Sequence, residues 1–348
     1  MNPYSNTKPY QRWSSAVADR YFTDVDWTLE KRFEITKTDK IISLGSCFAQ
    51  HIARSLLNEG YNYLFADECL QQPTGRTFSA RYGNVYSIRQ ARQLLERAFS
   101  LAEYPLSSES WRSHSGRIID PFRPNEFPDG FDTEHEMLQE RERHLTNVRD
   151  VFSRADIVIF TLGLTETWLD TKSGAALPVA PGVYGGPWPS ANHQFVNFSF
   201  RECDDDLRSF LAILQRINPS IRVILTVSPV SLVATMENQS VAISTCHSKS
   251  VLRAVAGELS RAGNSVFYFP SYEIIVGPFA SGHALQENFR DADKAGVQRV
   301  MEEFLRLFTS CHHSSKNQAL ANLRRMQNPE SLTIENVECD DNLILTMI

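Results

Sequence analysis

The sequence lacks the paired cysteines that mark a structural zinc site or a disulfide framework. None of its cysteines forms a C-x-x-C pair, and their spacing is irregular. We therefore expect no bound metal, and reduced thiols typical of a reducing compartment. The six cysteines are Cys47, Cys69, Cys203, Cys246, Cys311 and Cys339.

Long apolar runs and an excess of basic charge are also missing. The run within 156–163 is far shorter than the roughly 18 apolar residues of a spanning helix. Residues 1–10 contain no apolar signal-peptide core, so we expect no membrane span and a cytoplasmic location. The net charge of −6 argues against a nucleic-acid partner. Because neither a Walker lysine motif nor G-x-G-x-x-G occurs, we expect no cofactor.

The residues that are present indicate a folded α/β protein. Apolar residues make up 42% and charged residues 22% of the chain, as in ordinary globular domains. Short β-branched and aromatic runs are typical of buried parallel strands and alternate with amphipathic helical patterns. This alternation predicts a three-layer α/β sandwich with a mostly parallel sheet of about five strands. The predicted strands are 40–45, 61–66 (the weakest), 157–162, 222–227 and 265–269, and the predicted helices are 48–57, 207–214, 248–259 and 295–308.

Two segments interrupt the alternation and are predicted to be insertions, at about 95–150 and 170–200. Insertions in α/β proteins commonly build the walls of a site. We expect a single domain over 1–310 that includes both insertions, followed by a C-terminal tail over 311–348. The tail ends in an apolar stretch, so it is either a flexible terminus or a contact through which an oligomer forms.

The motif Gly45-Ser46-Cys47-Phe48-Ala49 resembles the name-giving motif of the GSCFA-domain family. Further segments resemble that family in its order over roughly 1–308. The resemblance implies an SGNH-hydrolase-like fold with a flavodoxin-like sheet, and ester or acyl-transfer chemistry at its carboxyl edge. The segments are 82–86 (YGNVY), 120–124 (DPFRP), 160–168 (FTLGLTETW), 226–230 (TVSPV), 248–253 (SKSVLR) and 268–273 (YFPSYE).

Cys47 and Ser46 are the candidate nucleophiles at the end of the first predicted strand. A thiol at a helix N-terminus has a lowered pKa and therefore more of the reactive thiolate. SGNH enzymes carry Gly-Asp-Ser at this turn, and ungapped matching to Gly45 places Cys47 at the position of that serine. The register favours Cys47, with Ser46 as the alternative nucleophile. Cys47 could instead pack as a small buried hydrophobe.

The resemblance also implies an oxyanion hole supplied by other strand ends. Gly83 and Asn84 match the position of the SGNH glycine donor. The turn that contains Gly163, Thr165 and Glu166 stands where these enzymes have Gly-x-Asn-Asp, so the hydroxyl of residue 165 would have to donate. An ionised carboxylate at position 166 cannot donate, but it could act as a base or orient a histidine. The alternative is that residues 165 and 166 only cap a helix.

The general base is the least defined part of the predicted site. SGNH enzymes place Asp-x-x-His before the last helix, whereas here Asp291 is followed three residues later by Lys294. His283 in the same loop is the first alternative. His51, one helical turn after Cys47, is the second, and His144 or His193 is a third. The fourth alternative is a site with no catalytic histidine.

These residues predict an SGNH-like hydrolase or O-acyltransferase that acts on an acyl ester, most simply an acetyl ester, of a carbohydrate or similar hydroxylated metabolite. The carbohydrate follows from Trp168, Tyr184 and Trp188, whose rings could stack on a sugar, and from the polysaccharide-making proteins that accompany the family. The alternative is a non-catalytic glycan- or acyl-binding or scaffold protein on the same fold, which the absent Asp-x-x-His favours.

Overall fold

The computed structural model describes residues 2–30, 32–66, 77–127, 129–280 and 282–310. Within these ranges the chain forms two compact units. One unit contains the described residues of 38–268, and the other combines those of 2–37 with those of 269–310. In the described ranges, every helix is too short or too polar to cross a bilayer. The predicted tail at 311–348 lies outside the described residues, and the single domain over 1–310 stays a prediction.

The central sheet contains four of the five predicted strands in the order β1-β4-β8-β9. Strands β1, β4 and β8 are parallel, and their register aligns Gly45 with Thr161 and Thr161 with Thr226. Every residue of β1 and β4 is buried, which explains their continuous apolar runs. The predicted α/β class with a parallel sheet is confirmed. The strands are β1 (Ile41–Gly45), β4 (Ile157–Leu162), β8 (Arg222–Val227) and β9 (Val266–Phe269).

The weakest predicted strand, 61–66, meets β1 at a single point. Tyr63 forms an isolated parallel bridge with Ile41. The amide of Ile41 donates to the carbonyl of Asn62 (2.9 Å), and the amide of Leu64 donates to the carbonyl of Ile41 (2.8 Å). The Tyr63 hydroxyl lies 2.7 Å from the Ser43 hydroxyl. This segment therefore occupies the edge position beside β1, as a flavodoxin-like order requires, without forming a strand.

Five helices accompany the sheet in the 38–268 unit, and three of them were predicted. Helix α5 begins earlier than expected, because Ser240 caps it, so Ser248 lies inside the helix and is not its cap. Helix α3 lies within the first predicted insertion and starts at a capping box formed by Thr133 and Glu136. The helices are α1 (Ala49–Asn58), α2 (Ile88–Ala98), α3 (Glu134–Arg154), α4 (Phe200–Ile217) and α5 (Val241–Ala262).

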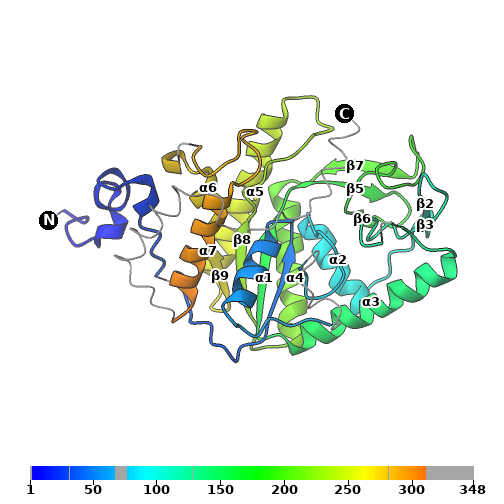
Figure 1. Cartoon of the computed structure of the whole chain (residues 1–348), viewed down its shortest axis with the longest axis horizontal. Coiled ribbons are helices and arrows are strands. Elements are labelled where there is room, and N and C mark those ends of the chain that lie inside the picture. The colour runs from blue at the N-terminus through cyan, green and yellow to red at the C-terminus, as the bar shows by residue number, and fades with distance from the viewer. Residues whose placement is uncertain (1, 31, 67–76, 128, 281, 311–348) are drawn as a thin grey trace. The chain divides into compact units, whose positions relative to one another are not determined.

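The two predicted insertions contribute small antiparallel elements that pack on each other (Figure 1). The first contributes the pair β2 (Trp111–Arg112) and β3 (Ile118–Ile119). The second contributes β6 and β7, which flank the preceding strand β5 in a three-stranded sheet of order β6-β5-β7. Trp111 and Ile119 share one buried cluster with Leu177 and Val179. The second sheet consists of β5 (Glu166–Asp170), β6 (Ala176–Leu177) and β7 (His193–Asn197).

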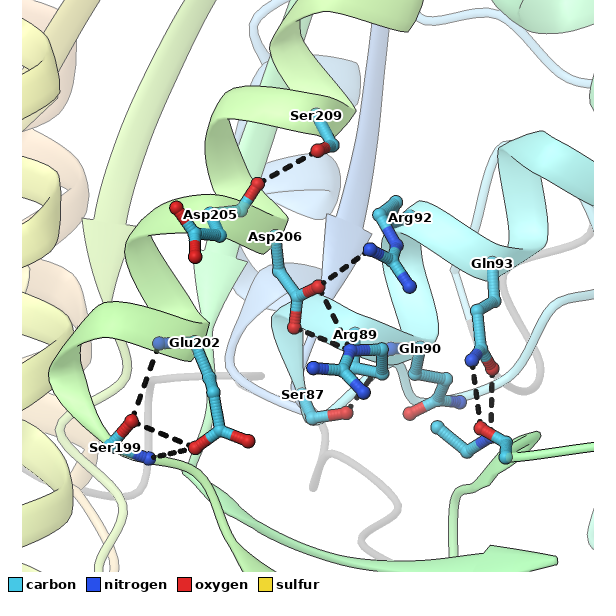
Figure 2. Close-up of polar contacts among 12 residues, drawn as sticks. Ser87, Arg89, Gln90, Arg92, Gln93, Ser199, Glu202, Asp205, Asp206 and Ser209 are labelled. Atoms are coloured by element: carbon cyan, nitrogen blue, oxygen red, sulfur yellow. Dashed lines mark hydrogen bonds and ion pairs between the residues drawn. The ribbon is translucent and has the colours of Figure 1, made fainter.

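A buried ion pair fastens α2 to α4 (Figure 2). The carboxylate of Asp206 on α4 is 1% exposed and accepts two hydrogen bonds from Arg89 Nε, at 2.6 and 2.8 Å. Arg92 Nη1 lies 3.0 Å from the same carboxylate. Burial raises the pKa of Asp206, and Arg89 opposes that effect. The pair therefore holds two helices together at a considerable desolvation cost.

We expect Asp206→Asn to lower the free energy of unfolding by about 2 kcal/mol, because Arg89 and Arg92 lose their charged acceptor in a buried position. Urea denaturation of purified protein measures the change. Asp205→Asn is the matched control, since Asp205 is exposed on the same helix. Equal losses in the two variants would show that the Asp206 ion pair does not stabilise the helix contact.

The second unit joins the N-terminal segment to the last helices. The amide of Ile35 donates to the carbonyl of Phe308 (2.6 Å), and the rings of Phe269, Phe304 and Phe308 pack together with centroid distances of 5.1 to 6.2 Å. Its helices are the short turns η1 (Pro9–Gln11), η2 (Ser14–Ala18), η3 (Phe22–Asp24) and η5 (Pro278–Ala280), with α6 (Ser271–Val276) and α7 (Lys294–Phe308).

Candidate functional site

Three residues follow neighbouring strands at the carboxyl edge of the central sheet. Ser46 follows β1, Gly163 follows β4 and Ser228 follows β8. The amide of Ser46 donates to the carbonyl of Thr161 (3.1 Å), and the amide of Ser228 donates to that of Leu162 (2.8 Å). Because parallel strands end at the same edge, these residues come together where α/β proteins bind ligands.

Two glycines allow the chain to approach itself closely at this edge. Gly45 has φ +131°, and a Cβ there would lie 2.1 Å from the carbonyl oxygen of Thr161. A Cβ on Gly163 would lie 2.7 Å from the carbonyl oxygen of Tyr86 and 3.3 Å from the Cβ of Ser46. Only glycine fits at either position. The first glycine of the sequence motif is therefore required by the packing of β1 against β4.

A cavity of about 220 Å³ opens at these strand ends within the 38–268 unit. Its polar lining includes Ser46, Cys47, Glu166 and Lys249. Most of the remaining wall is apolar and comes from segments 178–183 and 230–236, together with aromatic rings of β5 and β7. Such a mixture, a largely apolar wall with a few converging polar groups, is typical of a small-molecule site.

Ser46 and Cys47, the two candidate nucleophiles, both line the cavity. Ser46 is 3% exposed, and its Oγ has no hydrogen-bond partner among the described residues. Cys47 is disulfide-bonded, so its sulfur is not a thiolate in this state, in contrast to the expected reduced thiol. Helix α1 begins at Ala49, two residues beyond Cys47. The geometry therefore favours the hydroxyl of Ser46, whereas the sequence register favoured Cys47.

Lys249 brings a buried ammonium group to the same cavity. This residue of α5 is 2% exposed, and its Nζ donates to the carbonyl of Gly163 at 2.6 Å. An ammonium carries three N–H donors, and the bond to Gly163 uses one of them. Because Gly163 abuts Ser46, the bond fixes a positive charge beside the candidate nucleophile. A positive charge at this place stabilises an anion that develops on a substrate.

Glu166 places a carboxylate in the wall of the cavity. It is 8% exposed and accepts a hydrogen bond from Thr235 Oγ1 (2.7 Å). Burial raises the pKa of Glu166, the bond from Thr235 lowers it, and the charge of Glu237 raises it again, with a net upward shift. A carboxylate with a raised pKa is a stronger base than an ordinary one. Glu166 is the first residue of β5, so the alternative of a helix cap is wrong.

The other predicted oxyanion donors lie close to the site but have different contacts. Gly83 has φ +66° in the turn that precedes Asn84, which is 1% exposed. Thr165 Oγ1 donates to Asn197 Oδ1 (2.7 Å), and its amide donates to Ser248 Oγ (2.9 Å). Within the described residues, these three are not part of the cavity wall. The hydroxyl of Thr165 therefore ties β5 to β7 and does not point to an oxyanion.

Histidines are missing from the described wall of the cavity. The ring of His51 packs edge-on against Phe48, and burial followed by the charge of Arg54 lowers the pKa of His51 to about 4. His193 Nδ1 lies 2.9 Å from Ser190 Oγ. His144 is buried in a second cavity. None of these three is therefore placed as a base for Ser46.

His283 and Asp291 belong to the unit that contains 269–310, so their role as base and orienting acid stays a prediction. The carboxylate of Asp291 accepts hydrogen bonds from Asn288 Nδ2 (2.8 Å) and Arg290 Nη1 (2.7 Å). Asp293 caps α7 through the amide of Gly296 (2.5 Å). The acids of this loop thus have local structural partners of their own.

Sequence reasoning missed two contributions to the cavity. Lys249 lies in the segment 248–253 that resembles the family, but it was not among the predicted site residues, and Arg253 of the same segment lies over the ring of Tyr268 at 4.0 Å. The wall segment 230–236 carried no recognisable motif, whereas 178–183 lies in the second predicted insertion, where a wall was expected. In the described part of the chain no cluster of three His, Cys, Asp or Glu side chains could hold a metal ion.

The model of the GSCFA family matches residues 40–304 of the chain. No curated protein is detectably similar in sequence. The structure is similar to a carbohydrate esterase family 3 protein from Talaromyces cellulolyticus, with a TM-score of 0.36 and 11% identity over 83% of this chain and 99% of that one. A family 3 carbohydrate esterase from Clostridium thermocellum gives a TM-score of 0.29 and 11% identity over 83% and 98%. At these low scores, residue roles are taken only from this chain.

Proposed function

We propose that this chain, which belongs to the GSCFA family, cleaves acyl esters by nucleophilic attack of Ser46. The observation that carries the proposal is the hydroxyl of Ser46, which is buried at the end of β1 without a partner among the described residues, in a residue that lines the cavity. Desolvated, unpaired hydroxyls are costly to maintain, and they persist where function requires them. A buried carboxylate and a buried ammonium in the same wall supply the two charges that acyl transfer needs.

In the proposed mechanism each polar residue of the cavity has one role. Ser46 Oγ attacks the acyl carbon while its proton passes through one water to the carboxylate of Glu166. The ammonium of Lys249 stabilises the negative oxygen of the tetrahedral intermediate. As that intermediate collapses, Glu166 returns the proton to the leaving oxygen, which releases the alcohol and leaves an acyl group on Ser46. Water then hydrolyses the acyl-enzyme, whereas an O-acyltransferase would pass the acyl group to a second alcohol at this step.

The cavity wall favours an acyl group larger than the acetyl group of the sequence-based hypothesis. Val179 and Leu232 are buried in the wall, and Trp168 and Phe195 add aromatic surface. The ring of Trp168 also contacts that of Trp188 at a centroid distance of 5.1 Å. Trp188 is 54% exposed, so it offers a surface for the alcohol part, including a sugar. The proposed substrate is therefore an ester of an apolar acyl group with a hydroxylated alcohol.

We expect kcat/KM for p-nitrophenyl esters to rise by about fourfold for each methylene added to an acetyl group, until the cavity is filled. Each methylene moves from water to the apolar wall, which is the source of the gain. Steady-state kinetics over a series of acyl lengths measures the slope. A series of acetyl esters with increasingly apolar alcohols is the control. If kcat/KM rises only with the size of the alcohol and not with the length of the acyl chain, the cavity binds the alcohol and not the acyl group.

A non-catalytic binding protein is the second candidate, because no histidine lines the described cavity wall. The same ester series distinguishes the two functions. Hydrolysis that stays at the background rate for every ester, together with saturable binding of a product carboxylic acid measured by calorimetry, would establish a binding protein. Turnover of any ester in the series above background excludes it.

A further inference from the structure

A second, smaller cavity lies on the other side of segment 82–86 from the candidate site. Tyr82 and Val85 line this cavity, whereas Tyr86 lines the first one. Its remaining polar wall includes Arg97 of α2, Arg123, and His144 of α3. Among the described residues no carboxylate lines it. The space for water-sized particles is about 10 Å³, which is enough for one such particle and too little for a polyatomic group.

Several polar nitrogens of the residues that line this cavity have no partner within the described part of the chain. They are Arg97 Nε, Arg123 Nη2 and both ring nitrogens of His144. Arg123 and His144 are each 3% exposed, so water outside the protein cannot satisfy them. Buried polar groups of native proteins are nearly always hydrogen-bonded. Four unpartnered nitrogens around one small cavity therefore point to a ligand that accepts hydrogen bonds.

The neighbouring acids contact nitrogens other than the unpartnered ones. Asp120 accepts from Arg141 Nη2 (2.9 Å) and lies 3.4 Å from Arg123 Nε. Glu140 lies 3.9 Å from Arg123 Nη1. The guanidinium of Arg97 lies 3.6 Å above the ring of Phe122 and has no ion pair in the described residues. The cavity is therefore lined by two arginine side chains and, among the described residues, by no carboxylate.

The pKa shifts of His144 and Arg97 have the direction expected beside buried positive charge. Burial lowers the pKa of His144 well below its ordinary value, and the charges of Arg123 and Arg97 lower it further, so the imidazole is neutral with one N–H donor. Burial also lowers the pKa of Arg97 to about 9, although Asp120 opposes the effect. Both directions are those expected when positive charge is buried without a matching anion.

We propose that this cavity binds one small monoatomic anion, a halide such as chloride, held by Arg97 Nε, Arg123 Nη2 and the N–H of His144. A halide accepts from all three donors and balances the buried positive charge. The site also has a structural consequence for the first cavity. The amide of Val85 donates to the carbonyl of Gly45 (2.8 Å), and the carbonyl of Tyr86 accepts from Gly163 and Leu164. The bound anion therefore stabilises the segment that supports Ser46, independently of the chemistry proposed there.

The test is the melting temperature of the whole protein as sodium chloride replaces sodium gluconate at constant ionic strength. Gluconate is a monoanion too large for the cavity, so it controls for salt. We expect the Tm to rise by roughly 2–4 °C for each tenfold increase in chloride above the dissociation constant. Arg97→Met should lose this rise. Arg154→Met is the matched control, since Arg154 pairs with Asp150 on the surface of α3, and it should keep the rise.

Equal melting temperatures of the wild type in chloride and gluconate would overturn the proposal and leave a single water as the occupant. A chloride response that survives in Arg97→Met would also overturn it. Should Arg97→Met fail to fold, crystals of the wild type grown in bromide decide the matter. An anomalous peak within hydrogen-bond distance of Arg123 Nη2 supports the site, and its absence refutes it. None of these outcomes depends on whether the protein hydrolyses esters.

Discussion

Replacement of Ser46 by alanine is expected to lower kcat for ester hydrolysis by about 10⁴-fold or more, because no acyl-enzyme can form without the hydroxyl. Alanine removes only Oγ, which has no partner among the described residues, so the fold should be retained. Steady-state kinetics on the best ester of the acyl series measures the loss. A fluorophosphonate probe followed by peptide mass spectrometry should label Ser46 in the wild type and leave the variant unlabelled.

Two neighbours serve as controls for this prediction. Ser228 is 1% exposed and lines the same cavity at the end of β8, so Ser228→Ala should reduce activity far less than Ser46→Ala. Cys47→Ala separates the two candidate nucleophiles. Activity that is lost in Cys47→Ala and kept in Ser46→Ala would return the role to the thiol. Activity that is unchanged in both variants would show that the hydrolysis arises elsewhere.

The sheet could be predicted from the sequence because its strands are buried on both sides. The runs at 41–45 and 157–162 are continuously apolar or small, and they became β1 and β4. The run at 61–66 is interrupted by Asn62 and gave only the bridge at Tyr63. Helix α3 was missed because its 21 residues are strongly charged, although the capping box of Thr133 and Glu136 marks its start.

The candidate site could be predicted only in part. Gly45, Ser46 and Gly163 are placed by strand ends, and strand ends are visible in the sequence. The state of Cys47 could not be predicted, since a disulfide depends on tertiary distance rather than on spacing. Thr165 was misjudged because its hydroxyl is used by a neighbouring strand, and that pairing is a tertiary contact as well.

Lys249 illustrates a signal that was present in the sequence. On α5 it shares a buried stripe with Leu252, Val255, Ala256 and Leu259, at helical spacing. A lysine within an apolar stripe is costly unless its ammonium has a specific acceptor. The acceptor is the carbonyl of Gly163, 86 residues earlier in the chain. The position of the lysine therefore indicated a buried charge, and only the structure shows where that charge lies.

We expect Lys249→Met to lower kcat by about 10²–10³-fold with a smaller change in KM, because its positive charge acts on the developing oxyanion more than on the neutral ester. Methionine keeps the length and the apolar stem of the side chain but removes the charge.

Arg253→Met is the matched control, since Arg253 lies one turn further along α5 and packs on Tyr268 instead of lining the cavity. Circular dichroism and Tm report whether each variant is folded. A loss of kcat shared equally by the two variants would mean that Lys249 only stabilises α5. A loss confined to Lys249→Met, in a folded protein, would place a positive charge in the transition state of the reaction at Ser46.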